Sequence, residues 1–189
     1  MIGDAVRLAT FEGPWGPYRI AVTGRGVVAA AWTADAEGFR SDVARRLRGR
    51  DEGDDEPGMA AARLDELREA VEAILAGAPV DVRDVPVDLA DRPAFDRQVL
   101  EAVRTIGWGE TASYGEVARR AGSPRAARAA GGAIGRNAIS LLVPCHRVIA
   151  ADGTLGGYGG ADPTARADAL AWKQELLLRE GRAVRGRTR

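Results

Sequence analysis

Residues 140–149 read SLLVPCHRVI and place the only cysteine and the only histidine of the chain side by side. A cysteine is a nucleophile only as the thiolate, and a neighbouring imidazole or guanidinium group lowers the pKa of the thiol. The alternative is an inert buried thiol beside a structural histidine. Adjacent side chains of an extended strand diverge, so we expect Cys145 to reach His146 through a water molecule or through a turn at Pro144.

The segment that precedes this stretch predicts two short helices. Residues 113–116 (SYGE) form a capping-box pattern that opens a helix through Ala121. Gly122 can end that helix in the left-handed conformation, and residues 123–124 (SP) can begin the next one. Two short helices so close together make a helix-turn-helix candidate. The second one, PRAARAAGGAIG at 124–135, is almost all alanine and glycine, which suits either a close approach to a groove or tight packing against a neighbouring helix.

The first ninety residues predict a small α/β unit. Residues 18–32 read as two short strands joined at a turn with two glycines, since glycine supplies the positive φ that a tight hairpin needs. Helices are expected near 38–48 and, from the spacing of apolar residues, over 60–76. The acidic segment 49–58 is expected to be a mobile loop, and the valines of 80–87 are expected to form an extended strand.

Charge divides the chain into two halves. It has 189 residues and a formal net charge of zero, yet residues 1–91 carry 18 acidic and 11 basic side chains, whereas residues 92–189 carry 9 acidic and 16 basic ones. Such an asymmetry hints at an anionic partner for the basic half. The apolar face of 95–106 predicts that this half is mainly helical. We therefore expect an α/β N-terminal domain over 1–90 and a mainly α domain with a helix-turn-helix over 91–189.

Composition excludes several classes of protein. One cysteine excludes an internal disulfide framework, and one cysteine with one histidine cannot build an ordinary structural zinc site, so no metal is expected. No apolar run approaches the roughly 18 residues of a membrane span. The N-terminus MIGDAVRLATFEG has neither the basic nor the apolar region of a signal peptide. A cytoplasmic protein without a membrane partner is therefore expected.

Several motifs follow one another in a fixed order along the chain. They are PCHRVI at 144–149, TASYGEVA at 111–118, GSPRAARAAGGA at 122–133, Asn137, GGY at 156–158 and KQELLLRE at 173–180. Together they resemble the O6-alkylguanine-DNA alkyltransferases, also called methylated-DNA–protein-cysteine methyltransferases. The resemblance covers residues 90–181 closely and the N-terminal hairpin region loosely, and it implies an RNase H-like fold for the N-terminal domain.

The resemblance implies DNA repair by direct damage reversal. The alkyl group of O6-alkylguanine, and of O4-alkylthymine, in duplex DNA would move irreversibly to Cys145 after the base is flipped out, once per molecule and without a cofactor. His146 would act through a water molecule as the base that forms the thiolate, and Glu180 would orient His146. Tyr114 would donate a proton as the base leaves. Asn137 would brace the turn between the recognition helix and the segment that carries the cysteine.

The resemblance also implies how DNA is bound. Duplex DNA is the partner, and the recognition helix enters its minor groove, a groove about 6 Å wide that excludes large side chains. Arg128 would hold the gap that the flipped base leaves, with a phosphate contact as the alternative. A monomer is expected, and cooperative binding along DNA stays open. The further DNA-contacting residues are Ser113, Ala126, Ala127, Ala129 and Gly131, and the substrate pocket is formed by Pro144, Val148, Tyr158 and Gly159.

Two departures from the family pattern bear on the pocket. The connection 161–172 before the closing helix is longer than usual, and Gly159 replaces a side chain that some members have. Two other functions stay open. A non-catalytic lesion-binding protein would carry another residue in place of Cys145. A helix-turn-helix transcription regulator would need polar base-reading side chains, whereas 126–134 offers little besides Arg128.

Overall fold

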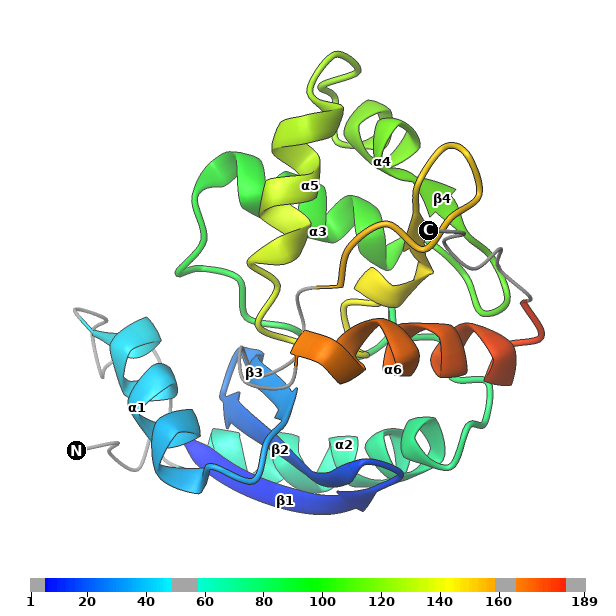
Figure 1. Ribbon diagram of the computed structural model, residues 1–189. Coiled ribbons are helices and arrows are strands. Elements are labelled where there is room, and N and C mark those ends of the chain that lie inside the picture. Colours follow the sequence, from blue (N-terminus) through cyan, green and yellow to red (C-terminus); the bar gives the residue numbers. More distant parts are fainter. Residues whose placement is uncertain (1–5, 49–57, 159–165, 183–189) are drawn as a thin grey trace.

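A small antiparallel sheet forms the N-terminal half of the fold, and helices cover both of its faces (Figure 1). The computed structural model describes residues 6–48, 58–158 and 166–182. The sheet has the order β1-β2-β3. Its strands are β1 (Arg7–Gly13), β2 (Gly16–Thr23) and β3 (Gly26–Trp32).

The predicted hairpin at 18–32 is confirmed as β2 and β3. Gly26 is required in its turn for two reasons. Its φ is 140°, and a Cβ there would stand 2.5 Å from the carbonyl oxygen of Pro86. The sequence does not predict β1. This strand lies at the edge of the sheet and buries only Phe11 fully, so its apolar alternation is weak.

Two helices pack on opposite faces of the sheet. Helix α1 (Ala36–Leu47) buries Phe39 and Val43 in a cluster that includes Ala21 of β2. Helix α2 (Met59–Leu75) packs with the other face, and its buried side chains share a core cluster with Ile20. Both helices match the predicted ranges within a few residues. Residues 49–57, most of the loop expected at 49–58, lie outside the described part of the chain.

The extended strand predicted at 80–87 is wrong. These residues form turns, and only Val87 makes a strand-like bridge, to Val27. The guanidinium of Arg104 holds the turns: its Nη2 atom donates to the carbonyl oxygens of Val82 at 3.1 Å and of Val85 at 2.6 Å. These turns place Val82 and Val85, three positions apart, in the interior, where both are at most 3% exposed.

The C-terminal half is built from packed helices. They are α3 (Ala94–Arg104), α4 (Tyr114–Arg120) and α5 (Ala127–Gly135), and each of the three contacts the other two. The capping box that opens α4 is confirmed: the hydroxyl of Ser113 accepts from the backbone of Glu116, whose carboxylate accepts from the backbone of Ser113. Gly122 follows with a φ of 75°, as expected for a helix end.

Helix α5 begins at Ala127, three residues later than predicted from Pro124. The backbone N–H of Ser123 donates to the carbonyl of Ala118, which completes the end of α4, and that of Ala126 donates to the carbonyl of Ser123. The residues after Gly122 therefore form a separate turn, and this turn uses the positions that the sequence assigns to the first turn of α5.

The closing helix α6 (Arg166–Arg179) is longer than predicted. Residues 166–172, expected to belong to a long connection, are its first turns. Residues 159–165 lie outside the described part of the chain. Helix α6 runs between the sheet and the helical half (Figure 1). Within the described ranges, no helix has both the length and the apolar character needed to cross a bilayer.

Candidate active site

The segment that carries Cys145 leaves the sheet through tight turns. Residues 138–140 lie along β3, Leu141 has a left-handed φ of 66°, and Cys145–Arg147 form the 3-10 turn η2. Strand β5 (Val148–Ile149) begins only after this turn and pairs in parallel with β4 (Ala112–Ser113). Cys145 therefore lies in a turn that follows Pro144 and not on an extended strand.

Asn137 spans the base of this loop. Its Nδ2 atom donates to the carbonyl of Val143 at 3.0 Å, and its Oδ1 atom accepts from the backbone N–H of Ile139 at 3.0 Å. Its side chain also acts on Cys145, where it lowers the pKa of the thiol. The amide is buried, so each of these bonds replaces a lost contact with water. Asn137 thus fixes both ends of the turn that precedes the cysteine.

Cys145 is buried but lies in the wall of a pocket of about 240 Å³. Burial raises the pKa of the thiol, while the hydrogen bond with Asn137 and the charge of Lys173 lower it. The raised pKa means that the thiol needs a base to become a thiolate at neutral pH. The pocket is lined by Tyr114, Gly131, Ile134, Gly135, Cys145, Gly157 and Tyr158.

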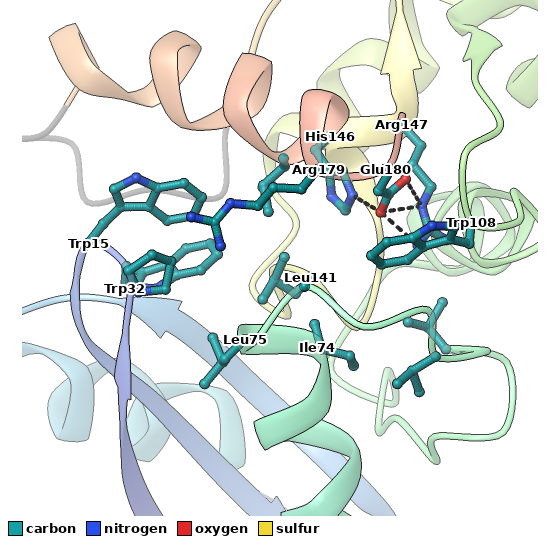
Figure 2. A pocket seen from close by; sticks show the side chains of 15 residues that line it. Trp15, Trp32, Ile74, Leu75, Trp108, Leu141, His146, Arg147, Arg179 and Glu180 are labelled. Carbon is teal, nitrogen blue, oxygen red and sulfur yellow. Dashed lines mark hydrogen bonds and ion pairs between the residues drawn. The ribbon is translucent and has the colours of Figure 1, made fainter. Parts of the chain in front are cut away.

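His146 and Glu180 form a buried pair beside the cysteine. The Nε2 atom of His146 lies 2.9 Å from Oε1 of Glu180. Glu180 also accepts from Arg147, whose Nη2 atom is 2.9 Å from Oε1 and whose Nη1 atom donates to the carbonyl of Ile106 at 2.7 Å. The Arg147 guanidinium lies over the Trp108 ring, 5.9 Å from its centroid. Figure 2 shows these groups converging at one end of a narrow cavity.

The charges of this pair are fixed by their surroundings. Burial lowers the pKa of His146, against the opposing effect of its bond to Glu180, so the imidazole is neutral at pH 7. Burial acts to raise the pKa of Glu180, but its bonds with His146 and Arg147 outweigh burial and lower the pKa to about 2. A carboxylate at Oε1 makes Nε2 the protonated nitrogen of the ring. The Nδ1 atom, buried and without a hydrogen-bond partner among the described residues, is then the basic nitrogen.

Lys173 is a site residue that the sequence analysis does not identify. It is fully buried, and its Nζ atom donates to the carbonyls of Val148 at 2.5 Å, Leu155 at 2.7 Å and Gly157 at 2.8 Å. Burial lowers the pKa of Lys173 to about 8, and the nearby Cys145 opposes that effect. The sequence offers one signal for its role, since Lys173 is the only lysine of an arginine-rich chain. This ammonium ties the segment after the cysteine to the loop at 155–157.

Tyr114, at the start of α4, closes the pocket from another side. Its hydroxyl accepts from the backbone N–H of Gly157 at 3.2 Å. Gly156 approaches the same ring: its φ is 67°, and a Cβ there would stand 3.0 Å from the hydroxyl oxygen. Gly131 of α5 lies against the other edge, 3.5 Å from the ring by the same measure. The glycines at these positions let two segments approach the tyrosine closely.

The predicted DNA-contacting residues lie on or beside α5. Arg128 and Ala129 are exposed, whereas Ala126, Ala127 and Gly131 are partly buried. The inward side of the helix buries Ala130, Ala133 and Ile134. Ser113 is engaged in the cap of α4. The helix therefore packs by its alanines, as one of the two interpretations of its composition expects, and its outer surface carries one long side chain, Arg128.

The structure does not bring every predicted pocket residue to the pocket. Tyr158 lines it together with Cys145 and Tyr114. Pro144 and Val148 are buried but do not line it, and the carbonyl of Val148 accepts from Lys173. Gly159 lies outside the described part of the chain. Among the described residues, no group of three or more His, Cys, Asp or Glu side chains could hold a metal ion.

Comparisons with known proteins relate the chain to one family. A protein-family model described as "6-O-methylguanine DNA methyltransferase, DNA binding domain" matches residues 94–182. A methylated-DNA–protein-cysteine methyltransferase of Mycolicibacterium paratuberculosis is 50% identical over 99 residues, which cover 52% of this chain and 54% of the relative. The chain thus spans about half the length of that curated relative.

Solved structures extend the similarity to both halves. The O6-methylguanine methyltransferase of Mycobacterium tuberculosis superposes with a TM-score of 0.66 at 34% identity, covering 94% of each chain. The Mycobacterium tuberculosis protein in complex with DNA superposes with a TM-score of 0.64 at 34% identity, covering 93% of this chain and 94% of that one. With a relative at this identity covered over nearly its whole length, the chain belongs to the methylated-DNA–protein-cysteine methyltransferase family.

Proposed function

We propose that this protein repairs DNA by direct reversal of alkylation. It would transfer the alkyl group of O6-alkylguanine, and of O4-alkylthymine, in duplex DNA to Cys145. The observation that carries this proposal is a thiol in a pocket wall beside a buried, neutral His146 paired with Glu180. Relatives that bear the name methylated-DNA–protein-cysteine methyltransferase support it. The reaction needs no cofactor, because a thiolate can displace the guanine oxygen from the alkyl carbon directly.

The proton of the thiol would pass through a water molecule to Nδ1 of His146. This direction is supported by the bond of Nε2 to Glu180, which leaves Nδ1 as the acceptor. The Cys145 sulfur then attacks the alkyl carbon, an S–C bond forms, and the C–O bond breaks. The Tyr114 hydroxyl supplies a proton to the departing guanine and recovers one from solvent. The product thioether has no bond that water cleaves readily, so each molecule reacts once.

Two aromatic side chains of the pocket would also hold the flipped base in place. Tyr114 and Tyr158 line the pocket with Cys145 and offer aromatic faces to a purine. Asn137 would keep the cysteine loop in place, since it bonds to Val143 and Ile139 on either side. We assign Pro144 and Val148 a supporting position in the wall, one layer behind the lining residues.

Helices α4 and α5 would act as a helix-turn-helix that docks α5 into the minor groove. The exposed Arg128 and Ala129, with Ala126, Ala127 and Gly131 beside them, give α5 an outer face with a single long side chain. Such a face suits a groove that narrow. Arg128 would enter the base stack in place of the flipped nucleotide, while Ser113 would approach the backbone of DNA from the cap of α4. The structure of the Mycobacterium tuberculosis relative with DNA supports DNA as the partner.

We assign residues 1–90 to a supporting α/β domain of RNase H-like topology and residues 91–189 to a DNA-binding, alkyl-accepting domain. The charge difference between the halves supports this division. One hydrophobic cluster includes side chains of both halves, such as Ile20 of β2 and Val99 of α3, so the two parts would work as one rigid unit. We propose a monomer as the active form, because one chain carries all the groups that the reaction uses.

One experiment separates this function from its alternatives. The protein is incubated with an oligonucleotide duplex that contains O6-methylguanine, and intact and peptide masses are recorded. We expect a gain of one methyl group on the peptide of Cys145, at most once per molecule. Tight lesion binding with no adduct would instead identify a non-catalytic lesion-binding protein. Binding that depends on sequence and ignores the lesion would identify a transcription regulator.

The matched control is Cys145→Ala. This variant should bind the lesion duplex with the affinity of the wild-type protein but gain no mass. Transfer by Cys145→Ala would show that another residue is the acceptor. A parallel duplex with O4-methylthymine tests the second substrate.

A further inference from the structure

The segment that leads to Cys145 is held by the N-terminal sheet. The backbone N–H of Ala30 donates to the carbonyl of Ala138 at 2.7 Å, and the carbonyl of Ala30 accepts from the backbone N–H of Ser140 at 2.9 Å. The Ser140 hydroxyl donates to the same carbonyl at 2.8 Å. Residues 138–140 thus lie as an added parallel partner along β3.

A side chain from the middle of the sheet completes this attachment. The hydroxyl of Tyr18 on β2 donates to the carbonyl of Ser140 at 2.7 Å. Tyr18 is fully buried and packs against Trp32, with ring centroids 5.1 Å apart. A phenylalanine would supply the same ring. A buried hydroxyl is costly to desolvate unless it is bonded, and the bond to Ser140 satisfies this one while it holds the Ser140 carbonyl in place.

The chain from Ser140 to the nucleophile is short and stiff. The same carbonyl of Ser140 also accepts from the backbone N–H of Leu142 at 2.8 Å, across Leu141 with its left-handed φ of 66°. The N–H of Cys145 then donates to the carbonyl of Val143 at 2.7 Å. A displacement of the Ser140 carbonyl would therefore also displace the Cys145 thiol, because each turn between them is closed by a hydrogen bond.

We propose that Tyr18 and Ser140 are positioning residues for Cys145, through which the N-terminal sheet sets the place of the nucleophile. The inference rests on the proposed function for its meaning, but the contacts that carry it are independent of any substrate. Neither side chain lines the pocket, so neither would touch the alkylated base. Their effect on the reaction would be transmitted by the backbone of 140–145.

The test uses the single cysteine as its own reporter. Tyr18→Phe and Ser140→Ala each remove one hydrogen-bonding oxygen and keep most of the packing. The matched control is Thr10→Val, which removes the bond from Arg19 to the Thr10 hydroxyl on the exposed side of the same sheet. Each protein is treated with iodoacetamide over a pH series, and separately with free O6-benzylguanine, and adducts on Cys145 are quantified by mass. Urea unfolding establishes that every variant is folded in the assay.

We expect Tyr18→Phe to slow transfer from O6-benzylguanine by about tenfold, since small displacements of a reacting group are costly in rate. The pH midpoint of its reaction with iodoacetamide should fall. Burial is the main cause of the raised pKa of the Cys145 thiol, and a loosened loop would admit water to it. Ser140→Ala should change both readouts in the same direction and serves as the second variant should Tyr18→Phe fail to fold. Thr10→Val should match the wild-type protein in both.

Two results would overturn the inference. In the first, the folded Tyr18→Phe and Ser140→Ala variants keep both the rate and the pH midpoint of the wild-type protein. In the second, their rates fall but the midpoint does not move, which would make these residues structural supports only. Failure of the proposed function looks different: the wild-type protein would then take up no benzyl group, while the iodoacetamide profiles would still report on positioning.

Discussion

The Nζ atom of Lys173 lies 2.5 Å from the carbonyl oxygen of Val148, with the charge of a fully buried ammonium directed at the backbone just after the nucleophile turn. Two more carbonyls, of Leu155 and Gly157, complete its shell. A buried charge is tolerated only where its bonds offset the loss of water. The pocket wall and the stability of the protein therefore depend on the protonation state of one side chain.

Lys173→Met should change how stability depends on pH. The pKa of Lys173 is about 8 in the folded protein and 10.5 ordinarily. Above pH 8 the unfolded chain therefore binds more protons, and stability rises with pH. We expect a rise of about 1 kcal/mol between pH 8 and 9 in the wild-type protein. Urea unfolding at several pH values measures it, and the rise should vanish in Lys173→Met. The same slope in both proteins would contradict this assignment.

Glu180→Gln should weaken the protein at neutral pH and remove an acid transition. The pKa of Glu180 is lowered to about 2 from 4.5, so its contribution is present above pH 4.5 and is lost as the pH falls towards 2. That difference corresponds to about 3 kcal/mol. As the pH falls from 4.5 towards 2, the free energy of unfolding of the wild-type protein should decrease by more than protonation of its other carboxylates accounts for. In Glu180→Gln the decrease over the same range should be smaller.

Glu175→Gln is the control for that experiment. Glu175 pairs with Arg179 on the exposed side of the same helix, at 3.1 Å, and surface pairs contribute little. A loss of stability as large in Glu175→Gln as in Glu180→Gln would show that the buried position is not decisive.

His146→Gln should make the reaction depend on hydroxide. With its base removed, the raised pKa of Cys145 leaves little thiolate at pH 7, and transfer from free O6-benzylguanine should slow by about 10²-fold. The deficit should shrink as the pH approaches the pKa of the thiol, because solvent then supplies the thiolate. Rates from pH 6.5 to 9.5 test this. A deficit that is the same at every pH would mean that His146 does not act as a base.

Arg128→Ala should affect duplex DNA and spare the free base. Arg128 is exposed on α5. If it holds the gap left by a flipped nucleotide, its loss should slow repair of an O6-methylguanine duplex by about tenfold or more, since extruding a base costs a few kcal/mol. Reaction with free O6-benzylguanine should not change.

Arg125→Ala gives the comparison for Arg128. Arg125 is also exposed, in the turn before α5, and its loss removes the same charge. If Arg128 only contacted a phosphate, its loss would weaken DNA binding and lower the salt dependence of binding as much as the loss of Arg125 does. We expect only Arg128→Ala to slow the reaction of DNA that is already bound.

Local rules of sequence predict the elements that local interactions stabilise. The cap of α4 rests on Ser113 and Glu116, three positions apart, and its end rests on Gly122, so short patterns are sufficient. Tertiary contacts override the other predictions. Val82 and Val85 are buried in turns whose carbonyls bond to the distant Arg104. Strand β1 is defined by pairing with β2 rather than by its own alternation.

The residues of the candidate site likewise fall into those that the sequence identifies and those that only the fold reveals. Cys145 and His146 are identified from adjacency, and Glu180 from a resemblance in spacing, because each has a recognisable sequence context. Lys173 and Tyr18 have none. Their roles arise from carbonyls of segments far away in the chain, at Val148 and Ser140, which only the folded backbone brings to them.

The single cysteine and the single lysine of this chain can each be labelled selectively. Its only thiol and its only lysine amine belong to the same site, one in the pocket wall and the other sealed behind it. Thiol reagents therefore report access to the pocket, whereas lysine-directed reagents report the rarer opening that frees Nζ from its three carbonyls. Two orthogonal labels can thus follow breathing of one catalytic centre without any substitution in the chain.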